Sequence, residues 1–301
     1  MELLMDGVID THIHLSEHYK GGLPNSWHPK VDSPGFQRDW SLEDFRASTK
    51  RGAGGASRFG VVGAIFVECF NEGPLEEAQW VLDLMQKDPF LLGLVAQIRV
   101  QQGPEHVKAF LEKIRLPSGE LPKGLKGARF VFMACENQAD DACLDPVFLE
   151  GLQVLSDAQL LWEFCCEPRM ALHLPSCIKR FPKMTFVIDH LAHNGSKGGD
   201  MDTWGPAIDA LGQLPNVYMK MGATEQWEVE DPGAYMDRAI KAFGFDRILY
   251  ESNWFVNEAM GDAYDRTATL LYEACQRAGA SDLDLVKVFR GNACHVYQLD
   301  L

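Results

Sequence analysis

The stretch Val8-Ile-Asp-Thr-His-Ile-His-Leu15 indicates both the fold and the place of a site. It begins apolar and places His12 and His14 two residues apart. Residues two apart on a β-strand face the same side, so both imidazoles leave the strand together. Such a pair can hold a metal ion or a polar substrate, or it can be satisfied by neighbouring carbonyls. Because the first strand of a (β/α)8 barrel ends at the active-site face, its place early in a long α/β chain favours a functional role.

Apolar segments of strand length recur along the rest of the chain and alternate with segments of helical periodicity. The expected strands cover residues 8–15, 61–68, 90–99, 127–133, 159–166, 184–190, 217–221 and 247–252. The expected helices begin at the capping box Ser41–Asp44 and at Gly73, and then cover 107–114, 146–155, 170–180, 203–214, 232–243, 262–279 and 283–289. Near-continuous apolar strands are typical of a parallel sheet that is buried on both faces.

Eight such units in 301 residues predict an α/β protein built as one (β/α)8 TIM barrel, a single domain over residues 1–301. The alternative is an open, doubly wound sheet. Against it, no G-x-G-x-x-G motif follows any expected strand.

The composition narrows the classes of partner. With 43 acidic and 28 basic residues the formal charge is −15, which excludes nucleic acid and anionic membrane surfaces but not a small anionic substrate. No signal peptide and no transmembrane span are recognisable. The eight cysteines form no C-x-x-C pair, which indicates reduced thiols and a cytoplasmic protein. The oligomeric state stays open, and a homo-oligomer is allowed.

A polar loop dotted with aromatic residues covers residues 16–40. Loops of this length in compact domains are usually lids or binding loops, or they are disordered. Trp27, Phe36 and Trp40 favour an ordered loop, so we expect an insertion near the active site.

Polar residues collect where the expected strands end, which is where barrel enzymes hold their chemistry. They are Glu68, Arg99, Arg129, Glu163, Asp189, His190, Lys220, Glu251, Asn253 and Trp254. An ion pair or a hydrogen bond at the rim explains Glu68, Arg99, Glu163 or Lys220 taken singly. His190, at the end of an apolar strand, is the strongest functional candidate among them.

Several motifs together resemble the amidohydrolase superfamily, and more closely its amidohydrolase-2 branch, which contains sugar-acid and dicarboxylate lactonases. The matching pieces run nearly from end to end of the chain. They are His12-Ile-His14, Gly127-Ala-Arg129, Phe186-Val-Ile-Asp-His-Leu191, Asn216-Val-Tyr-Met-Lys220, Phe243-Gly-Phe-Asp-Arg-Ile-Leu249, Glu251-Ser-Asn-Trp254 and Gly291-Asn-Ala293.

The resemblance implies a (β/α)8 barrel that hydrolyses lactones or related bonds, in some members with one divalent metal, typically zinc, and in some lactonases with none. It implies His12, His14 and His190 as catalytic residues and metal ligands. It implies Arg129 as the residue that holds a substrate carboxylate or hydroxyl groups, and it gives Lys220 a place at the substrate. Trp27, Trp227 and Trp254 would give the pocket apolar or sugar-stacking walls, although each can equally serve the core.

One departure from the branch bears on the mechanism. The branch usually ends its eighth strand with Gly-Ser-Asp-Trp-Pro, whereas this chain has Glu251-Ser-Asn253-Trp254-Phe255. An Asn amide cannot take a proton from water near neutral pH, so Asn253 cannot act as the base that the family aspartate supplies. Either the Asn is an engineered replacement, or Glu251 or His190 has taken over as base, or hydrolysis has been lost. The segment 159–166 also lacks the histidine that complete metal sites have there.

The leading hypothesis is a hydrolase that opens a small polar or carboxylated lactone by attack of an activated water. A metal on His12 and His14 could activate the water, or the two imidazoles could polarise the carbonyl directly while His190 takes the proton. Arg129 offers a bidentate fork for a carboxylate. The alternatives are a metal-dependent aromatic-acid decarboxylase and a ligand-binding barrel deficient in hydrolysis. In each case the partner is a small molecule, anionic or sugar-like.

Overall fold

Eight parallel strands form a nearly closed barrel in a computed structural model that describes residues 5–20, 22, 23, 25, 27–50, 58–132, 139–192, 201–224 and 231–301. Neighbouring strands pair in the order in which they occur in the chain. Their bounds are β1 Met5–Ile13, β2 Phe59–Val67, β3 Leu91–Gln97, β4 Leu125–Val131, β5 Leu161–Cys165, β6 Phe186–Ile188, β7 Val217–Met221 and β8 Ile248–Tyr250. The predicted TIM barrel is confirmed.

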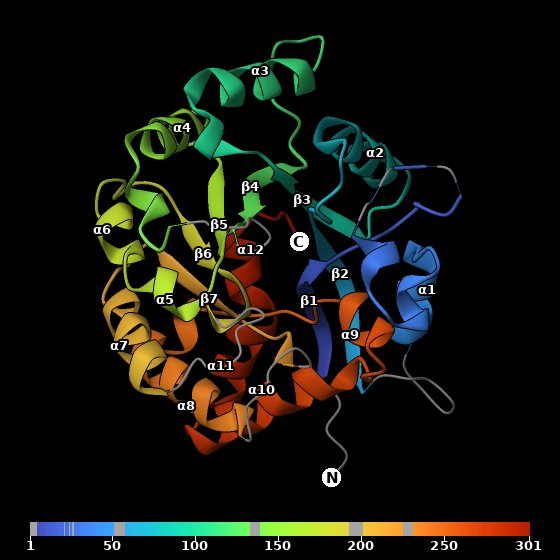
Figure 1. The fold of residues 1–301 in the computed structure, drawn as a ribbon. Coiled ribbons are helices and arrows are strands. Elements are labelled where there is room, and N and C mark those ends of the chain that lie inside the picture. The colour runs from blue at the N-terminus through green and yellow to red at the C-terminus, as the bar shows by residue number, and fades with distance from the viewer. Residues whose placement is uncertain are drawn as a thin grey trace.

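Helices surround the strands as an outer ring, except the last helix, which lies across one end of the barrel (Figure 1). They are α1 Leu42–Ser48, α2 Pro74–Lys87, α3 Pro104–Ile114, α4 Pro146–Asp157, α5 Pro168–Ala171, α6 Leu174–Ile178, α7 Met201–Gly212, α8 Pro232–Phe243, α9 Val256–Ala259, α10 Asp265–Arg277, α11 Asp282–Val286 and α12 Asn292–Val296. The capping box at Ser41 and Asp44 opens α1 as expected, because each side chain bonds the other's backbone N–H. The single helix expected over 170–180 is instead the short pair α5 and α6. No described helix is both long and apolar enough to cross a membrane.

Asp10 holds the first and last strands together. Its Oδ1 accepts hydrogen bonds from the backbone N–H of His12 at 3.1 Å and of Ser252 at 3.0 Å. Its Oδ2 accepts a hydrogen bond from the Tyr264 hydroxyl at 2.8 Å. Burial raises the pKa of Asp10 to about 6, although these bonds oppose the shift. This side chain therefore fixes the strand ends that carry the His-x-His pair and the Ser252–Asn253 turn.

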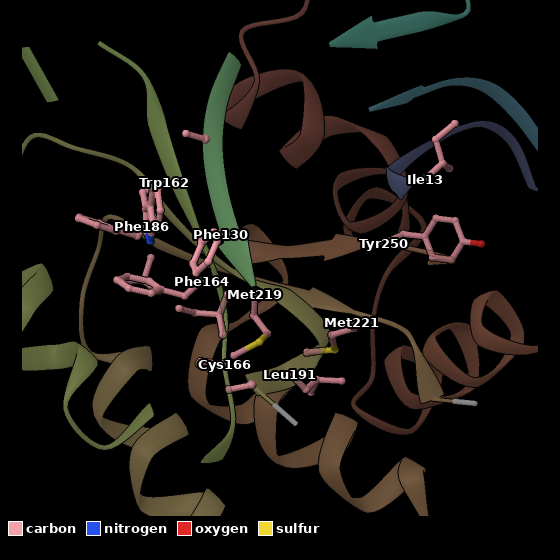
Figure 2. Packing of buried hydrophobic residues seen from close by; sticks show 14 of the residues in the cluster. Ile13, Phe130, Trp162, Phe164, Cys166, Phe186, Leu191, Met219, Met221 and Tyr250 are labelled. Atoms are coloured by element: carbon pink, nitrogen blue, oxygen red, sulfur yellow. The ribbon is translucent and has the colours of Figure 1, made fainter. Parts of the chain in front are cut away.

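Apolar side chains fill two regions, one on each side of the strands. The outer region packs strands against helices, with Trp162, Phe164 and Phe186 in ring contact (Figure 2). The inner region lies within the barrel, and its buried members include side chains from six of the eight strands. Its members include Ile9, Ile65, Val67, Val95, Leu161, Val187 and Leu249. This inner cluster is the floor on which the polar site rests.

The loop 16–40 closes on itself and packs against the segment that follows β8. The backbones of Ser16 and Trp40 exchange two hydrogen bonds, of 2.9 and 3.0 Å. The Trp40 ring stacks on Phe255 at 5.6 Å between centroids, and Phe255 in turn lies 6.3 Å from the ring of His14. The described part of the loop is thus connected to His14 by a chain of ring contacts.

Candidate active site

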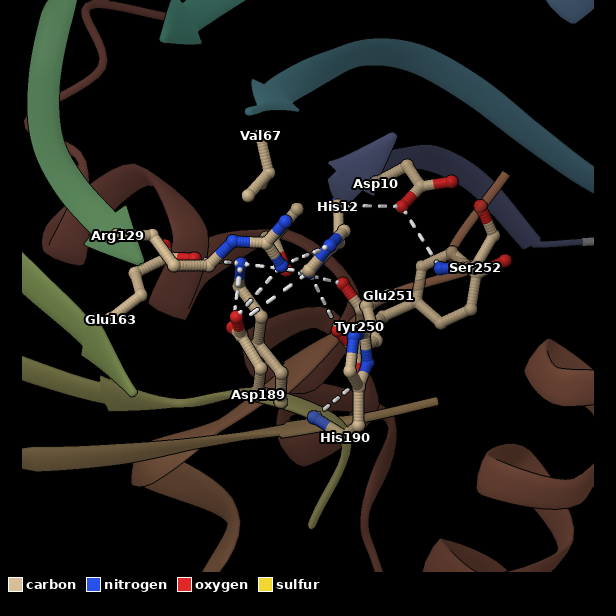
Figure 3. A network of polar contacts seen from close by, with 12 residues as sticks. Asp10, His12, Val67, Arg129, Glu163, Asp189, His190, Tyr250, Glu251 and Ser252 are labelled. Carbon is tan, nitrogen blue, oxygen red and sulfur yellow. Dashed lines mark hydrogen bonds and ion pairs between the residues drawn. The ribbon is translucent and has the colours of Figure 1, made fainter. Parts of the chain in front are cut away.

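The carboxyl ends of the strands bring a cluster of charged side chains together above the apolar floor (Figure 3). We call this set the strand-end cluster. Every member is buried. The members are His12 on β1, Glu68 after β2, Arg129 on β4, Glu163 on β5, Asp189 and His190 after β6, Lys220 on β7 and Glu251 after β8.

Arg129 lies in the middle of the strand-end cluster and is held on three sides. Its Nε donates to Glu68 Oε1 at 2.9 Å, and its Nη2 donates to the Glu68 carbonyl oxygen at 2.7 Å. Its Nη1 donates to Asp189 Oδ2 at 3.2 Å and to His12 Nε2 at 3.0 Å. Four of the five guanidinium N–H groups are therefore used within the described structure, and one on Nη2 is left. Burial disfavours the charge, but the carboxylates, Glu68 first, raise the pKa of Arg129 above its ordinary value.

His12 is a neutral imidazole of fixed tautomer. An arginine can only donate, so Nε2 accepts from Arg129 and the proton sits on Nδ1. Nδ1 faces Glu251 Oε2 at 3.0 Å and has Lys220 Nζ at 3.3 Å. Burial and then the charge of Lys220 hold the pKa of His12 well below 6.5. His12 therefore cannot serve as an acid near neutral pH.

His190 and Glu251 form an imidazole–carboxylate pair. Glu251 Oε1 accepts from His190 Nδ1 at 2.9 Å and from the His190 backbone N–H at 2.9 Å. With its proton on Nδ1, the imidazole carries its lone pair on Nε2. Burial alone would lower the pKa of His190, but the charge and the hydrogen bond of Glu251 outweigh it and raise that pKa above 6.5. The pair has the arrangement of a general base with its orienting carboxylate.

His14 and Asn253 stand next to each other at the same end of the barrel. His14 Nδ1 donates to the Val67 carbonyl oxygen at 2.8 Å, and the Asn253 side chain hydrogen-bonds to His14. Burial, and then the charge of Arg129, lowers the pKa of His14 to about 3. The Asn253 backbone has a φ of 60°, which Asn tolerates better than most residues, and its N–H donates to the His12 carbonyl oxygen at 3.1 Å.

The site residues lie at two depths. His14, Arg129, His190 and Asn253 keep 6, 3, 2 and 2% of their surface exposed, whereas Lys220 keeps none. Lys220 Nζ lies 2.6 Å from Glu163 Oε2 and 3.2 Å from Asp189 Oδ1. Glu163 also accepts a hydrogen bond from the Tyr297 hydroxyl at 2.6 Å, so these groups seal the deep side. Lys220 therefore supports the site from below. This position does not favour the contact with substrate that the sequence predicted.

The charges of the deep groups follow from their neighbours. Burial raises the pKa of Glu163 to about 8, an effect that Asp189 reinforces and Lys220 opposes. For Asp189, burial also opposes ionisation, but Lys220 and Arg129 outweigh it and lower the pKa to about 2. The pKa of Lys220 is raised by Asp189 and Glu163 against the effect of burial. Lys220 and Asp189 are thus a buried ion pair at neutral pH.

Three residues could offer metal ligands from within the described chain. His12, Asp189 and His190 bring one donor atom each within 4.8 Å of one another. In this arrangement, however, both ring nitrogens of His12 already face a cation, Arg129 at 3.0 Å and Lys220 at 3.3 Å. A divalent ion would have to displace the Lys220 ammonium. The donor set as arranged therefore does not fit a metal, and we derive no step through one.

The tryptophans expected to line the pocket lie in different places. Trp254 is fully buried, contacts the rings of Trp40 and Phe45, and donates from Nε1 to Glu258 Oε2 at 2.6 Å. It belongs to the core beneath the loop and does not face a pocket. Trp27 is half-buried and donates from Nε1 to the Cys69 carbonyl oxygen at 3.0 Å, just after β2. Trp227 lies outside the described residues.

Comparison with known proteins identifies the family of this chain. The family model described as Amidohydrolase matches residues 9–299. This chain belongs to the amidohydrolase family. It is similar to the L-fucono-1,5-lactonase of Burkholderia ambifaria. The two are 24% identical over an alignment of 307 residues, gaps included, which covers 97% of this chain and 96% of that protein.

Two solved structures illustrate the fold. A Burkholderia multivorans amidohydrolase with bound zinc superposes with a TM-score of 0.76 at 19% identity, covering 97% of this chain and 99% of its own. A protein of Acinetobacter baumannii, described as a probable 2-pyrone-4,6-dicarboxylic acid hydrolase with citric acid bound, gives 0.70 at 13% identity with the same coverage.

Some polar residues that contact the candidate site residues were not predicted from the sequence. Gln97, Asp10 and Tyr297 were not singled out, although the first two break otherwise apolar strands. A polar residue inside an apolar strand is the signal that could have identified them. Glu251 was predicted from the sequence only as one of two alternative bases, the other being His190. Its bond to His190 depends on the meeting of two strand ends 61 residues apart.

Proposed function

We propose that this amidohydrolase is a lactonase that opens a small, neutral, hydroxylated lactone. The observation that carries the proposal is the His190–Glu251 pair, with both bonds at 2.9 Å. The His190 ring lies 4.6 Å from the ring of His12, which the Arg129 guanidinium contacts. The similarity to an L-fucono-1,5-lactonase supports the same reaction class.

The steps assign one task to each group. His190 takes a proton from water on Nε2 while the water oxygen bonds to the lactone carbonyl carbon. The N–H of Arg129 that the described structure leaves unused donates to the carbonyl oxygen as negative charge develops there. The bond from the carbonyl carbon to the ring oxygen then breaks, and that oxygen receives the proton from His190. Glu251 keeps the imidazole in its productive tautomer throughout.

The cations among the described site residues are already paired, which favours a neutral substrate. A substrate carboxylate needs a cation that is not already paired. Arg129 has one N–H left and cannot present a bidentate fork, and Lys220 is buried between Glu163 and Asp189. A hydroxylated sugar lactone fits this site better than the carboxylated lactone that the sequence also allowed.

The test is proton release from a panel of neutral sugar 1,4- and 1,5-lactones and of carboxylated lactones, followed with a pH indicator. His190→Asn removes the base but suits the backbone, since His190 has a φ of 53° and Asn tolerates that region. We expect the variant to lose on the order of 10²–10⁴-fold in kcat/KM. His295→Asn, at an exposed position on α12, is the matched control.

Other outcomes would point elsewhere. Release of carbon dioxide from hydroxybenzoic acids without lactone turnover would favour a decarboxylase. Binding of a sugar lactone without turnover would favour a hydrolysis-deficient binding protein. Faster turnover of carboxylated than of neutral lactones would overturn the charge argument.

A further inference from the structure

Gln97, the last residue of β3, is a buried amide without a hydrogen-bond partner among the described residues. Its side chain is 1% exposed, and neither Oε1 nor Nε2 has a partner. Burial of an unpaired amide destabilises a fold, so a native protein keeps one where something else satisfies it.

Strand geometry directs this amide into the barrel. Val95, two residues earlier, belongs to the inner apolar cluster with Ile65 and Val67. Side chains two apart on a strand face the same side, so Gln97 also faces inward, one level above that cluster. Its Cα is the register partner of Arg129 on β4. Gln97 thus stands beside the residue to which we assign the lactone carbonyl.

The neighbours at this level satisfy one another and leave Gln97 out. Arg129 is engaged by Glu68, Asp189 and His12. His14, across β2, is engaged by the Val67 carbonyl oxygen. The amide therefore faces the site with both an acceptor and a donor to offer.

We propose that Gln97 binds a substrate hydroxyl and is a specificity-determining residue of this site. An amide accepts through Oε1 and donates through Nε2, and a hydroxyl, or two adjacent hydroxyls, can do both in return. A carboxylate can only accept and would leave Oε1 unpaired. The assignment rests on the proposed lactonase function. It adds that Gln97, on β3, recognises the substrate hydroxyl next to the lactone carbonyl.

The test compares Gln97→Met with the wild-type chain on the best sugar lactone and on its single-deoxy analogues. Methionine has a similar length and no amide. For the parent lactone we expect kcat/KM to fall roughly 10- to 100-fold, the usual loss when one partner of a buried hydrogen bond is removed. One deoxy analogue should be turned over equally by both forms, because its missing hydroxyl is the one that Gln97 binds. Gln153→Met, at an exposed position on α4, should change neither value.

Stability gives an independent readout. Removal of an unpaired buried amide should leave the Tm of the free protein unchanged or raise it. A fall in Tm of several degrees, or an equal loss of kcat/KM for every lactone and deoxy analogue, would show a structural role and overturn the proposal.

Binding of 1,5-anhydroglucitol, a cyclic polyol without an ester, separates this inference from the proposed reaction. If no lactone is hydrolysed but the polyol binds the wild type about tenfold or more tighter than Gln97→Met, the hydroxyl site stands and only the lactonase proposal fails. If lactones are hydrolysed but Gln97→Met discriminates between the parent and deoxy substrates as the wild type does, the hydroxyl site fails alone.

Discussion

Glu251 Oε1 accepts two hydrogen bonds from His190, one from the ring Nδ1 and one from the backbone N–H, each at 2.9 Å. The double contact fixes both the position and the tautomer of the imidazole. A glutamine at position 251 would have the same shape, but its amide can donate to Nδ1 and favour the opposite tautomer. We expect Glu251→Gln to lower kcat/KM by about 10²–10⁴-fold.

The same variant should change the pH profile. Glu251 raises the pKa of His190, so the wild-type rate should rise with pH through a value above 6.5 as the imidazole loses its proton. Without the carboxylate, any residual activity should show this limb at lower pH. Glu273→Gln, on the exposed side of α10, is the control. A limb that stays in place would show that His190 is not the titrating base.

The sequence was sufficient for the barrel because its signal is local. Each apolar strand and each amphipathic helix is recognisable from a short stretch of sequence, and neighbouring strands pair in chain order. Short helices were harder, as α5 and α6 show, since Pro168 and Pro175 start two separate turns where one helix was expected.

The site could be predicted only as a set of strand ends. His12, His14, Arg129, His190 and Asn253 do meet at one end of the barrel. What each does depends on partners that lie far apart in sequence. Arg129 was expected to bind an anion because the sequence does not show that Glu68 and Asp189 surround it. Trp254 was expected to line the pocket because the sequence does not show that Trp40 packs over it.

Gly222, after β7, packs directly against Glu251 and leaves no space for a side chain. A Cβ at this position would fall on the carbonyl oxygen and Cγ of Glu251. Gly222→Ala should therefore displace the carboxylate from His190 and destabilise the fold by about 1–3 kcal/mol, seen as a lower Tm and a loss of turnover. Gly291→Ala is the matched control, because a Cβ there meets only ordinary contacts of 3.7 Å or more. Equal Tm and turnover in both variants would contradict this account.

Glu77, on α2, should make stability depend on pH. Its Oε1 accepts from the Cys69 backbone N–H at 3.0 Å and from Asn71 Nδ2. Burial, and then the charge of Glu68, raises the pKa of Glu77 to about 8, from 4.5. The folded state thus holds a proton that the unfolded state releases. The protonated Glu77 therefore contributes to the free energy of unfolding. This contribution is fully present below pH 4.5 and is lost as pH rises towards 8, by up to about 1.4 kcal/mol per pH unit.

Glu77→Gln keeps the shape and the acceptor but does not titrate. The Tm difference between variant and wild type should be near zero at pH 4.5 and should favour the variant at pH 8. Glu76→Gln, one residue earlier and exposed, should show no such trend. A variant that loses stability at pH 8 would mean that Glu77 is ionised in the folded state.

Metal removal should leave turnover unchanged. Arg129 and Lys220 place positive charge against both nitrogens of His12, at 3.0 and 3.3 Å, where a metal ion would need lone pairs. We expect dialysis against a chelator to leave kcat/KM for the best lactone within about twofold, and metal analysis to find less than one equivalent per chain before dialysis. Loss of activity that zinc or manganese restores would show that Lys220 moves aside for an ion.

Asn253→Asp tests whether the base has moved. If Asn253 were a vacant base, a carboxylate there should raise hydrolysis by about 10²–10⁴-fold. The structure argues for a smaller change, because Asn253 hydrogen-bonds to His14 and the base role already lies with His190 and Glu251.

An aspartate at position 253 would instead raise the pKa of His14 from about 3, since a negative charge beside it favours the imidazolium. We therefore expect an unchanged or lower rate, together with a His14 ring that titrates at higher pH by NMR. Turnover that rises tenfold or more in Asn253→Asp, and survives in the double variant with Glu251→Gln, would place the base at position 253 after all.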